Sequence, residues 1–260
     1  MSEAKQIHLA PITRGDAEKI VRACHYSGKT AFGSFLHFGV FLDGKCGGAI
    51  QFGPPVDKRK ILPLVKGTGW NGFLELNRMA FADWLPRNSE SRALSVAMRL
   101  IRNTYPHIEW VVSFADATQC GDGTIYRASG FVLTQIKENR SMWRTASGEV
   151  VADFVSRQLQ GENTRKRIGF RIGESWADFV KRTGAQRLPG FQLRYLYFLN
   201  SSARSRLTVP IIPFNEIERR GAAMYRGQAI SRAGSDTKDT AGLQPAKGGS
   251  TPTPALQSDA

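Results

Sequence analysis

The chain has 260 residues, of which 41% are hydrophobic, and a formal net charge of +14 at pH 7. That composition predicts a globular protein, and no apolar run approaches the roughly 20 residues of a membrane-spanning helix. The N-terminus lacks the pattern of a secretory signal, and three cysteines, an odd number, suit reduced thiols. We therefore expect a cytoplasmic protein without a membrane partner.

The positive charge is concentrated in one part of the chain. Residues 163–226 contain 13 Lys or Arg and four Asp or Glu, a balance of +9 that leaves +5 for the rest. A basic, solvated surface is the simple interpretation, and binding of a polyanion is the specific one. Aromatic residues are interleaved with the basic ones, so this region is folded, and we favour nucleic acid as its partner.

The chain alternates between predicted strands and helices. Apolar runs of period two predict strands, runs of period 3.6 predict helices, and Asp43-Gly44 predicts a hairpin turn. Thr13 can cap the first helix, and Gly47 and Gly48 suggest a bulge or a close approach by another backbone. In order, we predict a strand at 6–10, a helix at 13–24, a hairpin at 35–52, a strand at 73–81, a helix from 89, a strand ending at 116, a short helix before 130, strands at 132–136, 141–145 and 150–155, a helix at 175–183 and a strand at 191–199. The run at 141–145 is a candidate partner for 132–136.

The stretch from Val111 to Phe131 is central to the predicted site. It reads as a buried strand that delivers Asp116 at its carboxyl end, then a glycine loop, then a short helix that presents Tyr126. In open α/β sheets, ligands bind outside the carboxyl ends of the strands. Asp116 and Tyr126 are therefore the provisional centre of a site.

Two further positions have open interpretations. Arg78 lies in an otherwise apolar strand, where alternation groups it with Leu74 and Leu76. It must pair with a buried carboxylate or face a ligand, and the sequence leaves both open. His25 and Tyr26 follow a predicted helix, where a helix cap with a half-buried aromatic ring explains them without any function, and a site element is the alternative.

The helix that begins near residue 89 has a candidate anion-binding N-terminus. Arg87, Asn88, Ser89 and Ser91 gather there, and Asn88 or Ser89 is the expected cap. Helix N–H groups and the helix dipole favour phosphate at such a place. The indication is general, because every strand–helix unit has a helix N-terminus.

The order of elements over 13–136 resembles the GCN5-related N-acetyltransferase (GNAT) family. Residues 126–131 (YRASGF) resemble its Y-x-x-x-G-F ending, which implies Tyr126 as general acid and acetyl-coenzyme A as ligand. The glycine-bearing phosphate loop of that family is replaced by residues 86–91 (PRNSES), so helix N–H groups and serines would bind the pyrophosphate. The implied fold class is α/β, with a mixed, mostly antiparallel sheet flanked by helices and a basic C-terminal extension.

Four blocks resemble, in order and spacing, the Mom DNA-modification family of Mu-like bacteriophages. The blocks are 25–28 (HYSG), 75–79 (ELNRM), 113–116 (SFAD) and 123–126 (GTIY), within a resemblance over roughly residues 6–200. This resemblance implies conversion of adenine in DNA to N6-(carbamoylmethyl)adenine, which shields phage DNA from restriction enzymes in the host cytoplasm. It also implies acetyl-coenzyme A as a donor, and bound iron.

The Mom resemblance also implies roles for individual residues. Tyr26, Asp116 and Tyr126 match metal or catalytic positions, and Arg78 and Ser91 match positions associated with coenzyme binding. A carbamoylmethyl group joins N6 to a methylene carbon, which ordinary acyl transfer cannot achieve, so metal or radical chemistry is required. Two tyrosines and one aspartate differ from the familiar two-histidine, one-carboxylate iron site, and we hypothesise that His25 completes the set.

Adenine N6 lies inside a DNA duplex, so the base must be flipped out or presented single-stranded. Trp70 and Trp176 are candidates for stacking on that base, although core packing is the better interpretation of Trp176. A basic rim would hold phosphates of double-stranded DNA. The candidates for this rim are Arg165, Lys166, Arg167, Arg171 and Arg194. The sequence is also compatible with a homodimer.

We expect three parts: an acetyltransferase-like core over 1–145, a basic extension over 146–227 that completes the domain and is the candidate DNA-binding lobe, and a disordered tail over 228–260. Two alternative functions stay open. One is an N-acetyltransferase of proteins or small amines, which needs a general base and no metal but leaves the basic region unexplained. The other is a DNA-binding module with an inactive acyltransferase-like core, which the missing glycine loop favours.

Overall fold

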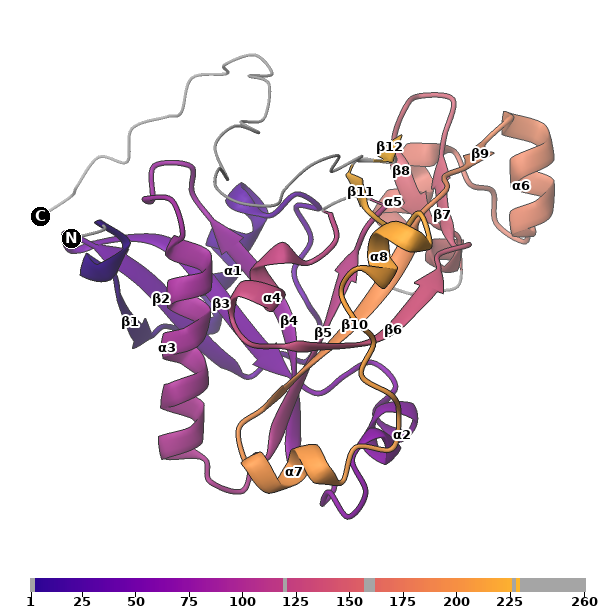
Figure 1. Ribbon diagram of the computed structural model, residues 1–260. Helices are drawn as coiled ribbons and strands as arrows, with labels where there is room; N and C mark the ends of the chain where they lie inside the picture. The colour runs from indigo at the N-terminus through magenta and orange to yellow at the C-terminus, as the bar shows by residue number, and fades with distance from the viewer. Residues whose placement is uncertain (1–2, 119–120, 157–161, 226–227, 230–260) are drawn as a thin grey trace, which may run out of the picture. The chain divides into compact units, whose positions relative to one another are not determined.

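The computed structural model describes residues 3–118, 121–156, 162–225 and 228–229. Its centre is a seven-stranded sheet in the order β1-β2-β3-β4-β5-β10-β6 (Figure 1). The pair β4–β5 is parallel, whereas the other neighbours in this sheet are antiparallel. The predicted fold class, a mixed and mostly antiparallel sheet flanked by helices, is confirmed.

Each predicted strand and helix has a counterpart in the structure, although the predicted strand at 150–155 is a strand only over Val150–Ala152, and several short helices were not predicted. The strands of the large sheet are β1 (His8–Pro11), β2 (Leu36–Leu42), β3 (Lys45–Gly53), β4 (Phe73–Phe81), β5 (Trp110–Asp116), β6 (Val132–Glu138) and β10 (Phe191–Phe198). The α-helices are α1 (Arg14–Cys24), α2 (Lys58–Ile61), α3 (Ser89–Thr104), α4 (Thr124–Ala128), α5 (Glu162–Ile168), α6 (Trp176–Thr183), α7 (Ser201–Ser205) and α8 (Glu216–Arg219). Short 3-10 turns cover Glu3–Gln6, Leu62–Leu64 and Asp153–Ser156.

Local chemistry accounts for several of these boundaries. The Thr13 hydroxyl accepts a hydrogen bond from the backbone N–H of Asp16 at the start of α1, as predicted. Asp43 and Gly44 both adopt positive φ, 50° and 75°, which is the geometry of a two-residue hairpin turn. The β2–β3 register shifts opposite Gly47, so the predicted bulge is present. The close neighbour there is a side chain and not a backbone, because an added Cβ would lie 2.3 Å from the Trp84 ring.

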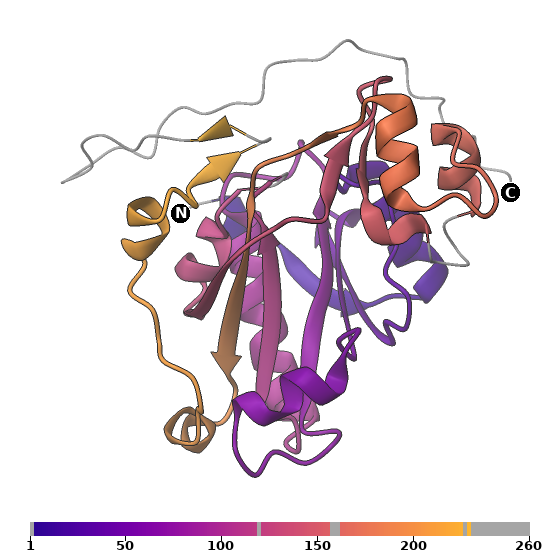
Figure 2. The same cartoon turned by 90° about the vertical axis from the view of Figure 1, so that its right-hand side faces the viewer.

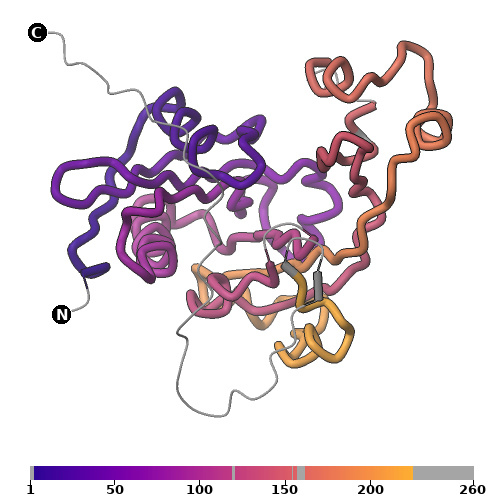
Figure 3. The backbone as a smooth tube through the Cα atoms, turned by 90° about the horizontal axis from the view of Figure 1, so that it is seen from above, coloured from indigo at the N-terminus to yellow at the C-terminus, as the bar shows by residue number. Residues whose placement is uncertain are grey.

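Helices cover both faces of the large sheet. Helix α3 buries Leu94, Met98 and Ile101 in the main hydrophobic core. Helix α1 lies on the opposite face, as the view in Figure 3 shows. Because side chains alternate along a strand, Leu74 of β4 points into the α3 core while Phe73 packs in a second cluster on the other face. The two faces thus have separate cores.

Strand β10 comes from the basic C-terminal region and yet lies inside the large sheet. It pairs with β5 on one side and with β6 on the other, and Leu193, Tyr195 and Leu196 are fully buried. The segment 191–198 is therefore part of the main core. The boundary at residue 146 stays a prediction.

The expected pairing of 141–145 with 132–136 is wrong. Strand β7 (Met142–Arg144) pairs with β8 (Val150–Ala152) and β9 (Gln186–Arg187) in a small separate sheet, and β6 pairs with β10. The longer, buried β10 provides a full ladder for β6, which three-residue β7 cannot match. A further hairpin joins β11 (Met224–Tyr225) to β12 (Gln228–Ala229).

Three other expectations depend on how much of the chain is described. The predicted disordered tail, apart from β12, lies outside the described residues. Cys24 and Cys46 carry free thiols, and Cys120 lies outside the described residues. Within the described part of the chain, no helix is both long and apolar enough to cross a membrane.

Candidate active site between diverging strands

The large sheet opens between β4 and β5. These parallel strands pair over only three residues each, Phe73–Glu75 with Trp110–Val112, although both continue well beyond that point in the described chain. On the other edge of β4 the register with β3 shifts, because Gln51 pairs with Arg78 and Phe52 with Leu76. Asn77 is thus the extra residue of a β-bulge, which bends the strand where the sheet opens.

A cleft of about 1840 Å³ adjoins this opening. Its lining comes from segments far apart in the sequence: the loop after α1, the segment 55–61 with α2, strands β4, β5, β6 and β10, the β7–β8 hairpin and helix α5. It brings together five of the predicted site residues: Tyr26, Arg78, Asp116, Arg167 and Arg194. Three of the four blocks in the sequence that carry the Mom resemblance therefore meet in one cleft.

His25 and Tyr26 enter this region from the end of α1. His25 is the helix C-cap, as its simple interpretation predicted, and its Nδ1 lies 2.8 Å from the Ser27 hydroxyl. Its ring packs on that of Tyr26 at a centroid distance of 4.2 Å, and Tyr26 is 54% exposed. Burial, with a smaller contribution from the charge of Arg78, lowers the pKa of His25 to about 4. The imidazole is therefore neutral at pH 7.

Arg78 is held by backbone groups. Its Nε donates to the carbonyl oxygen of Lys29 at 2.9 Å, and its Nη1 donates to that of Asn77 at 2.7 Å. The side chain lines the cleft, so these contacts fix a positive charge at the opening of the sheet. Carbonyl oxygens, and not the predicted buried carboxylate, are the partners seen here, and a ligand-facing role stays open.

Glu75 is a cleft residue to which the sequence analysis gave no role. Burial raises its pKa to about 7, against the opposing effects of a hydrogen bond from Asn77 and the charge of Arg78. It sits at the last β4–β5 pair, opposite Val112. The available signal was an acidic residue at an inward position of an apolar strand, the same argument that singled out Arg78.

Asp116 ends β5 and lines the cleft, as predicted for a residue at the carboxyl end of this strand. Its Oδ1 accepts hydrogen bonds from the Thr118 N–H at 3.0 Å and from the Asn139 side chain at 3.5 Å. These contacts orient the carboxylate from two different segments. The side chain is half-buried, so one edge can face a ligand.

Tyr126 lies in a different environment from Asp116. Helix α4 packs with α3, and the Tyr126 ring stacks at a tilt on Phe131 at 5.4 Å and on Tyr195 at 5.2 Å. Gly123 precedes this helix with φ +77°, and a Cβ there would lie 2.6 Å from Tyr195. Tyr126 is thus a partly buried ring that packs against the α3-side core. The described lining of the cleft does not include it.

The residues of the predicted phosphate site do not belong to the described lining of the cleft. Helix α3 begins at Ser89, and Asn88 precedes it at φ 71°, where its side chain makes no capping hydrogen bond in the described structure. Ser89 is buried and donates to the Pro86 carbonyl oxygen at 2.6 Å, and Ser91 donates to that of Asn88 at 3.2 Å. Arg87 is exposed. These side chains line the α3 N-terminus and not the described cleft wall.

The five predicted DNA-binding residues fall into two groups. Arg194 lies inside the cleft and is only 9% exposed, and its Nε donates to the Thr134 hydroxyl at 3.0 Å. The other four belong to the lobe of residues 162–187, which contains α5 and α6. There Arg165 donates to the Val155 carbonyl oxygen, Lys166 pairs with Glu162, Arg167 pairs with Glu149, and Arg171 is exposed. The expectation that Arg194 belongs to an outer rim is therefore corrected.

The two stacking candidates have different surroundings. Trp176 packs against Trp143, Phe170 and Phe179, which supports core packing as its role. Trp70 is 53% exposed and stacks with the Lys58 ammonium group, 4.8 Å from the ring centroid. Tyr26 is the exposed aromatic ring in the cleft lining.

The described residues fit the expected iron ligands only in part. They contain no cluster of three or more His, Cys, Asp or Glu side chains placed to bind a metal ion. Tyr26 and Asp116 line the same cleft and supply hard oxygen donors of a kind that iron accepts. Tyr126 packs against the α3-side core, so its role as a ligand stays a prediction.

Comparisons with known proteins agree with the family resemblance. The model of the Mom protein family matches residues 6–216. Methylcarbamoylase mom of Escherichia phage Mu is 34% identical over 209 residues, which cover 80% of this chain and 82% of that protein.

Similar solved structures include two acetyltransferases. The ribosomal-protein-S18-alanine N-acetyltransferase from Escherichia coli is 10% identical, with a TM-score of 0.40, over 75% of this chain and 94% of its own. Arabidopsis thaliana NAA60, in complex with a bisubstrate analogue, is 12% identical, with a TM-score of 0.42, over 74% and 97%. These distant likenesses carry no argument about the site.

The raised pKa of Glu75 predicts a pH-dependent stability. The folded state favours the protonated carboxyl, so this contribution is complete below the unfolded pKa near 4.5 and is lost as pH rises through about 7. Relative to Glu75→Gln, the wild type should lose on the order of 2 kcal/mol of unfolding free energy between pH 5 and pH 8. Urea denaturation of both proteins at the two pH values measures this difference. Parallel behaviour of the two proteins would contradict the assignment.

Proposed function

This chain belongs to the Mom protein family, and we propose that it converts adenine in DNA to N6-(carbamoylmethyl)adenine and so protects phage DNA from restriction. The relative from phage Mu is named a methylcarbamoylase. The observation that carries the proposal is the cleft in which Tyr26, Arg78 and Asp116 meet. These residues come from three separate sequence blocks, and the fold gives them one common ligand-accessible surface.

Double-stranded DNA is the proposed partner. The N6 amine must leave the duplex interior before it can react, so the adenine is flipped out or the strand is single. A volume of about 1840 Å³ exceeds the roughly 300–1,000 Å³ of a small-ligand pocket, so a nucleotide and a donor fit together. The basic lobe over 162–187 supplies charge for the phosphates beside the target.

Acetyl-coenzyme A is the proposed donor. Its pantetheine arm contains two amides, and the diverging edges of β4 and β5 offer backbone N–H and C=O groups to bind them. Helix α3 is the next element after β4, across the loop of residues 82–88, and its N-terminal N–H groups and dipole favour the pyrophosphate. The serines there donate to carbonyl oxygens of their own loop, so in this proposal backbone N–H groups replace the missing glycine loop.

Proton transfer is assigned to Glu75. Substitution at an amine nitrogen releases a proton, and a general base works best when its pKa lies near the operating pH. Glu75 meets that condition with a pKa of about 7 and lines the cleft. Arg78, fixed by two carbonyl oxygens, would hold the negative charge of the donor.

Iron is assigned to Tyr26 and Asp116. When bound there, it would supply the redox chemistry needed to functionalise a methyl carbon. The neutral imidazole of His25 is in the protonation state that binds metals. Its Nδ1 accepts the backbone N–H of Ser27 at 3.2 Å, so Nε2 carries the proton in this arrangement and would have to give it up to bind the ion.

One alternative gains support from Glu75. An N-acetyltransferase of a protein or small amine needs a general base near the acceptor, and Glu75 fits that role without a metal. Its product would carry an acetyl group on the acceptor amine. The product of the reaction therefore separates the two functions.

Asp116→Ala should abolish the modification of DNA, because it removes the carboxylate at the cleft end of β5. We expect N6-(carbamoylmethyl)adenosine in DNA from cells that express the wild type, and at least about a hundredfold less from cells with the variant, a loss typical of a catalytic group. Mass spectrometry of the digested nucleosides measures both amounts.

Asp83→Ala is the matched control, because Asp83 is exposed and lies outside the described cleft lining. It should modify DNA as the wild type does. An acetyl adduct, or no adduct from the wild type, would overturn the proposed reaction. Metal analysis of the purified proteins tests the iron assignment, which fails if Asp116→Ala retains as much iron as the wild type.

The basic lobe should bind DNA without regard to sequence. The double variant Lys166→Ala/Arg167→Ala removes two exposed charges and should weaken binding to all duplexes on the order of tenfold, with a salt slope shallower by about 1 to 2. Fluorescence anisotropy at several salt concentrations measures both quantities. Arg92→Ala/Arg99→Ala, on the exposed side of α3, is the matched control and should bind as the wild type does. Equal losses in both variants would contradict a specific role for the lobe.

A further inference from the structure

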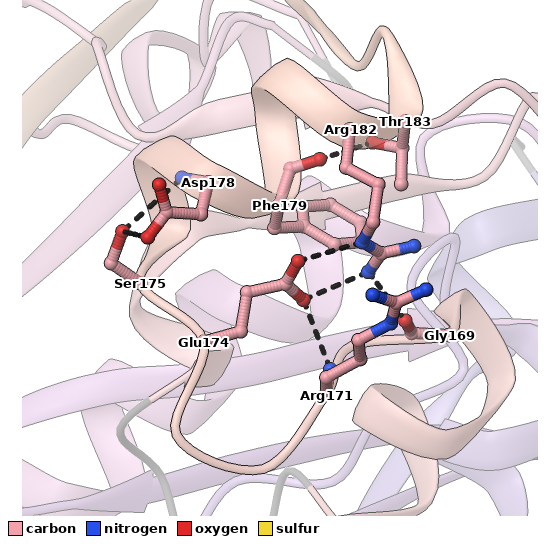
Figure 4. A network of polar contacts seen from close by, with 8 residues as sticks. All are labelled: Gly169, Arg171, Glu174, Ser175, Asp178, Phe179, Arg182 and Thr183. Atoms are coloured by element: carbon pink, nitrogen blue, oxygen red, sulfur yellow. Dashed lines mark hydrogen bonds and ion pairs between the residues drawn. The ribbon is translucent and has the colours of Figure 1, made fainter.

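The loop between α5 and α6 holds an apolar side chain fully in solvent. Ile172 is 107% exposed, which is unusual for isoleucine. A single exposed apolar residue needs no explanation by itself. The loop around Ile172, however, is held on both sides by hydrogen bonds and an ion pair to Arg182 and Glu174 (Figure 4).

Arg182 of α6 ties the two sides of this loop together. Its Nη2 donates to the carbonyl oxygen of Gly169 at 2.9 Å, and its Nε and Nη2 donate to the Glu174 carboxylate at 2.7 and 2.8 Å. The same carboxylate accepts the backbone N–H of Arg171 at 3.0 Å. Charge-assisted, bidentate contacts of this kind are the geometrically specific ones. The ends of the loop are thus fixed to a helix.

Aromatic packing against helix α6 also fixes the loop. Phe170 stacks on Trp176 at 5.9 Å and on Phe179 at 5.3 Å, and Phe179 is fully buried. Gly173, directly after Ile172, has φ +79°, which a β-branched or bulky residue rarely adopts. The backbone therefore turns sharply while its neighbours are held. Ile172 projects from a preorganised tip.

The loop lies in the basic lobe, directly after the helix α5 that reaches the cleft lining. Residues 162–187 contain seven Lys or Arg and three Asp or Glu. Helix α5, directly before the loop, contributes Arg167 to the cleft lining, where this residue pairs with Glu149. Figure 2 shows α5 and α6 beside the small sheet of β7, β8 and β9. Arg171, exposed and adjacent to Ile172, adds a charge at the tip.

We propose that Ile172 is a wedge that enters the base stack of a DNA duplex when the target adenine turns into the cleft, while Arg171 contacts a neighbouring phosphate. The inference deepens the proposed function and rests on it for the identity of the base. Proteins that deform DNA insert apolar side chains, isoleucine among them, between base steps. Extrusion of a base leaves a gap in the stack, and an apolar side chain that fills it lowers the cost.

The loop geometry suits such a wedge better than a general contact with phosphates. A phosphate contact needs only positive charge, and an apolar tip would add nothing to it. A mobile loop would lose conformational freedom on insertion, whereas the Arg182 and Phe170 contacts have already fixed this one. A partner protein that covers Ile172 is the competing occupant, and it predicts no effect of Ile172 on the DNA bases.

Fluorescence of 2-aminopurine tests the wedge directly, because its emission rises when the base leaves the stack. The probe is a pool of duplexes with randomised sequence on both sides of one 2-aminopurine, which includes every context for the target. At a wild-type concentration that binds all of the duplex, emission should rise, and Ile172→Ala should reduce this rise at least threefold. Ile172→Leu should restore it, because leucine also fills the gap.

Ile211→Ala is the matched control: Ile211 is also exposed, at 42%, and lies outside the lobe. It should behave as the wild type does. Two measurements exclude misfolding of Ile172→Ala. Its circular dichroism spectrum should equal that of the wild type, and so should its affinity for the same randomised oligonucleotides in single-stranded form. The wedge is overturned if the wild type produces no rise, or if Ile172→Ala produces the same rise.

Nucleoside analysis on the matching adenine-containing pool separates this result from the proposed function. A fluorescence rise that depends on Ile172, without a carbamoylmethyl adduct, supports the wedge and contradicts the proposed chemistry. An adduct formed equally fast by the wild type and Ile172→Ala on duplex DNA overturns the wedge and leaves the chemistry standing.

Discussion

The site depends on the short hydrogen-bonded ladder between strands β4 and β5, which ends after three residue pairs. Strands β4 and β5 run parallel and share only three residue pairs before they separate, and the Asn77 bulge bends β4 at that point. A continuous ladder would bury the backbone groups of both strands and close the sheet. The opening instead places Glu75, Arg78 and Asp116 around a cleft that the loop after α1 completes with Tyr26.

The electrostatics of the cleft follow from that geometry. Glu75 and His25 are pushed by burial toward their neutral forms, with pKa values of about 7 and about 4. The guanidinium group of Arg78 lies near them, where the backbone carbonyl oxygens of Lys29 and Asn77 accept its hydrogen bonds. The cleft thus combines cations held by hydrogen bonds, Arg78 and Arg194, with Glu75, a carboxyl that can hold or release a proton near pH 7. The proposed chemistry requires both: a carboxyl that accepts the proton of the amine, and a cation that holds the negative charge of the donor.

The sequence predicted local features better than distant ones. The cap at Thr13, the Asp43-Gly44 turn and Asp116 at the end of β5 follow from short-range rules, and the structure confirms them. The place of β10 between β5 and β6 depends on pairing across about 50 to 90 residues, which no local pattern indicates. Likewise, the bulge at Asn77 breaks the alternation that grouped Arg78 with the apolar residues of β4. Glu75 had a signal in the sequence, a carboxylate in an apolar strand, but only its burial in the structure showed that its pKa is raised.

The central claim is that the cleft on the α1 side of the sheet holds a DNA adenine. Photo-crosslinking tests it most directly, with randomised duplexes that carry one 8-azidoadenine and with peptide mapping by mass spectrometry. The account predicts crosslinks to residues of the cleft lining, such as Tyr26 or Phe114, that free adenine nucleotide does not form. Crosslinks confined to the α3 face, or to no part of the cleft, would contradict it.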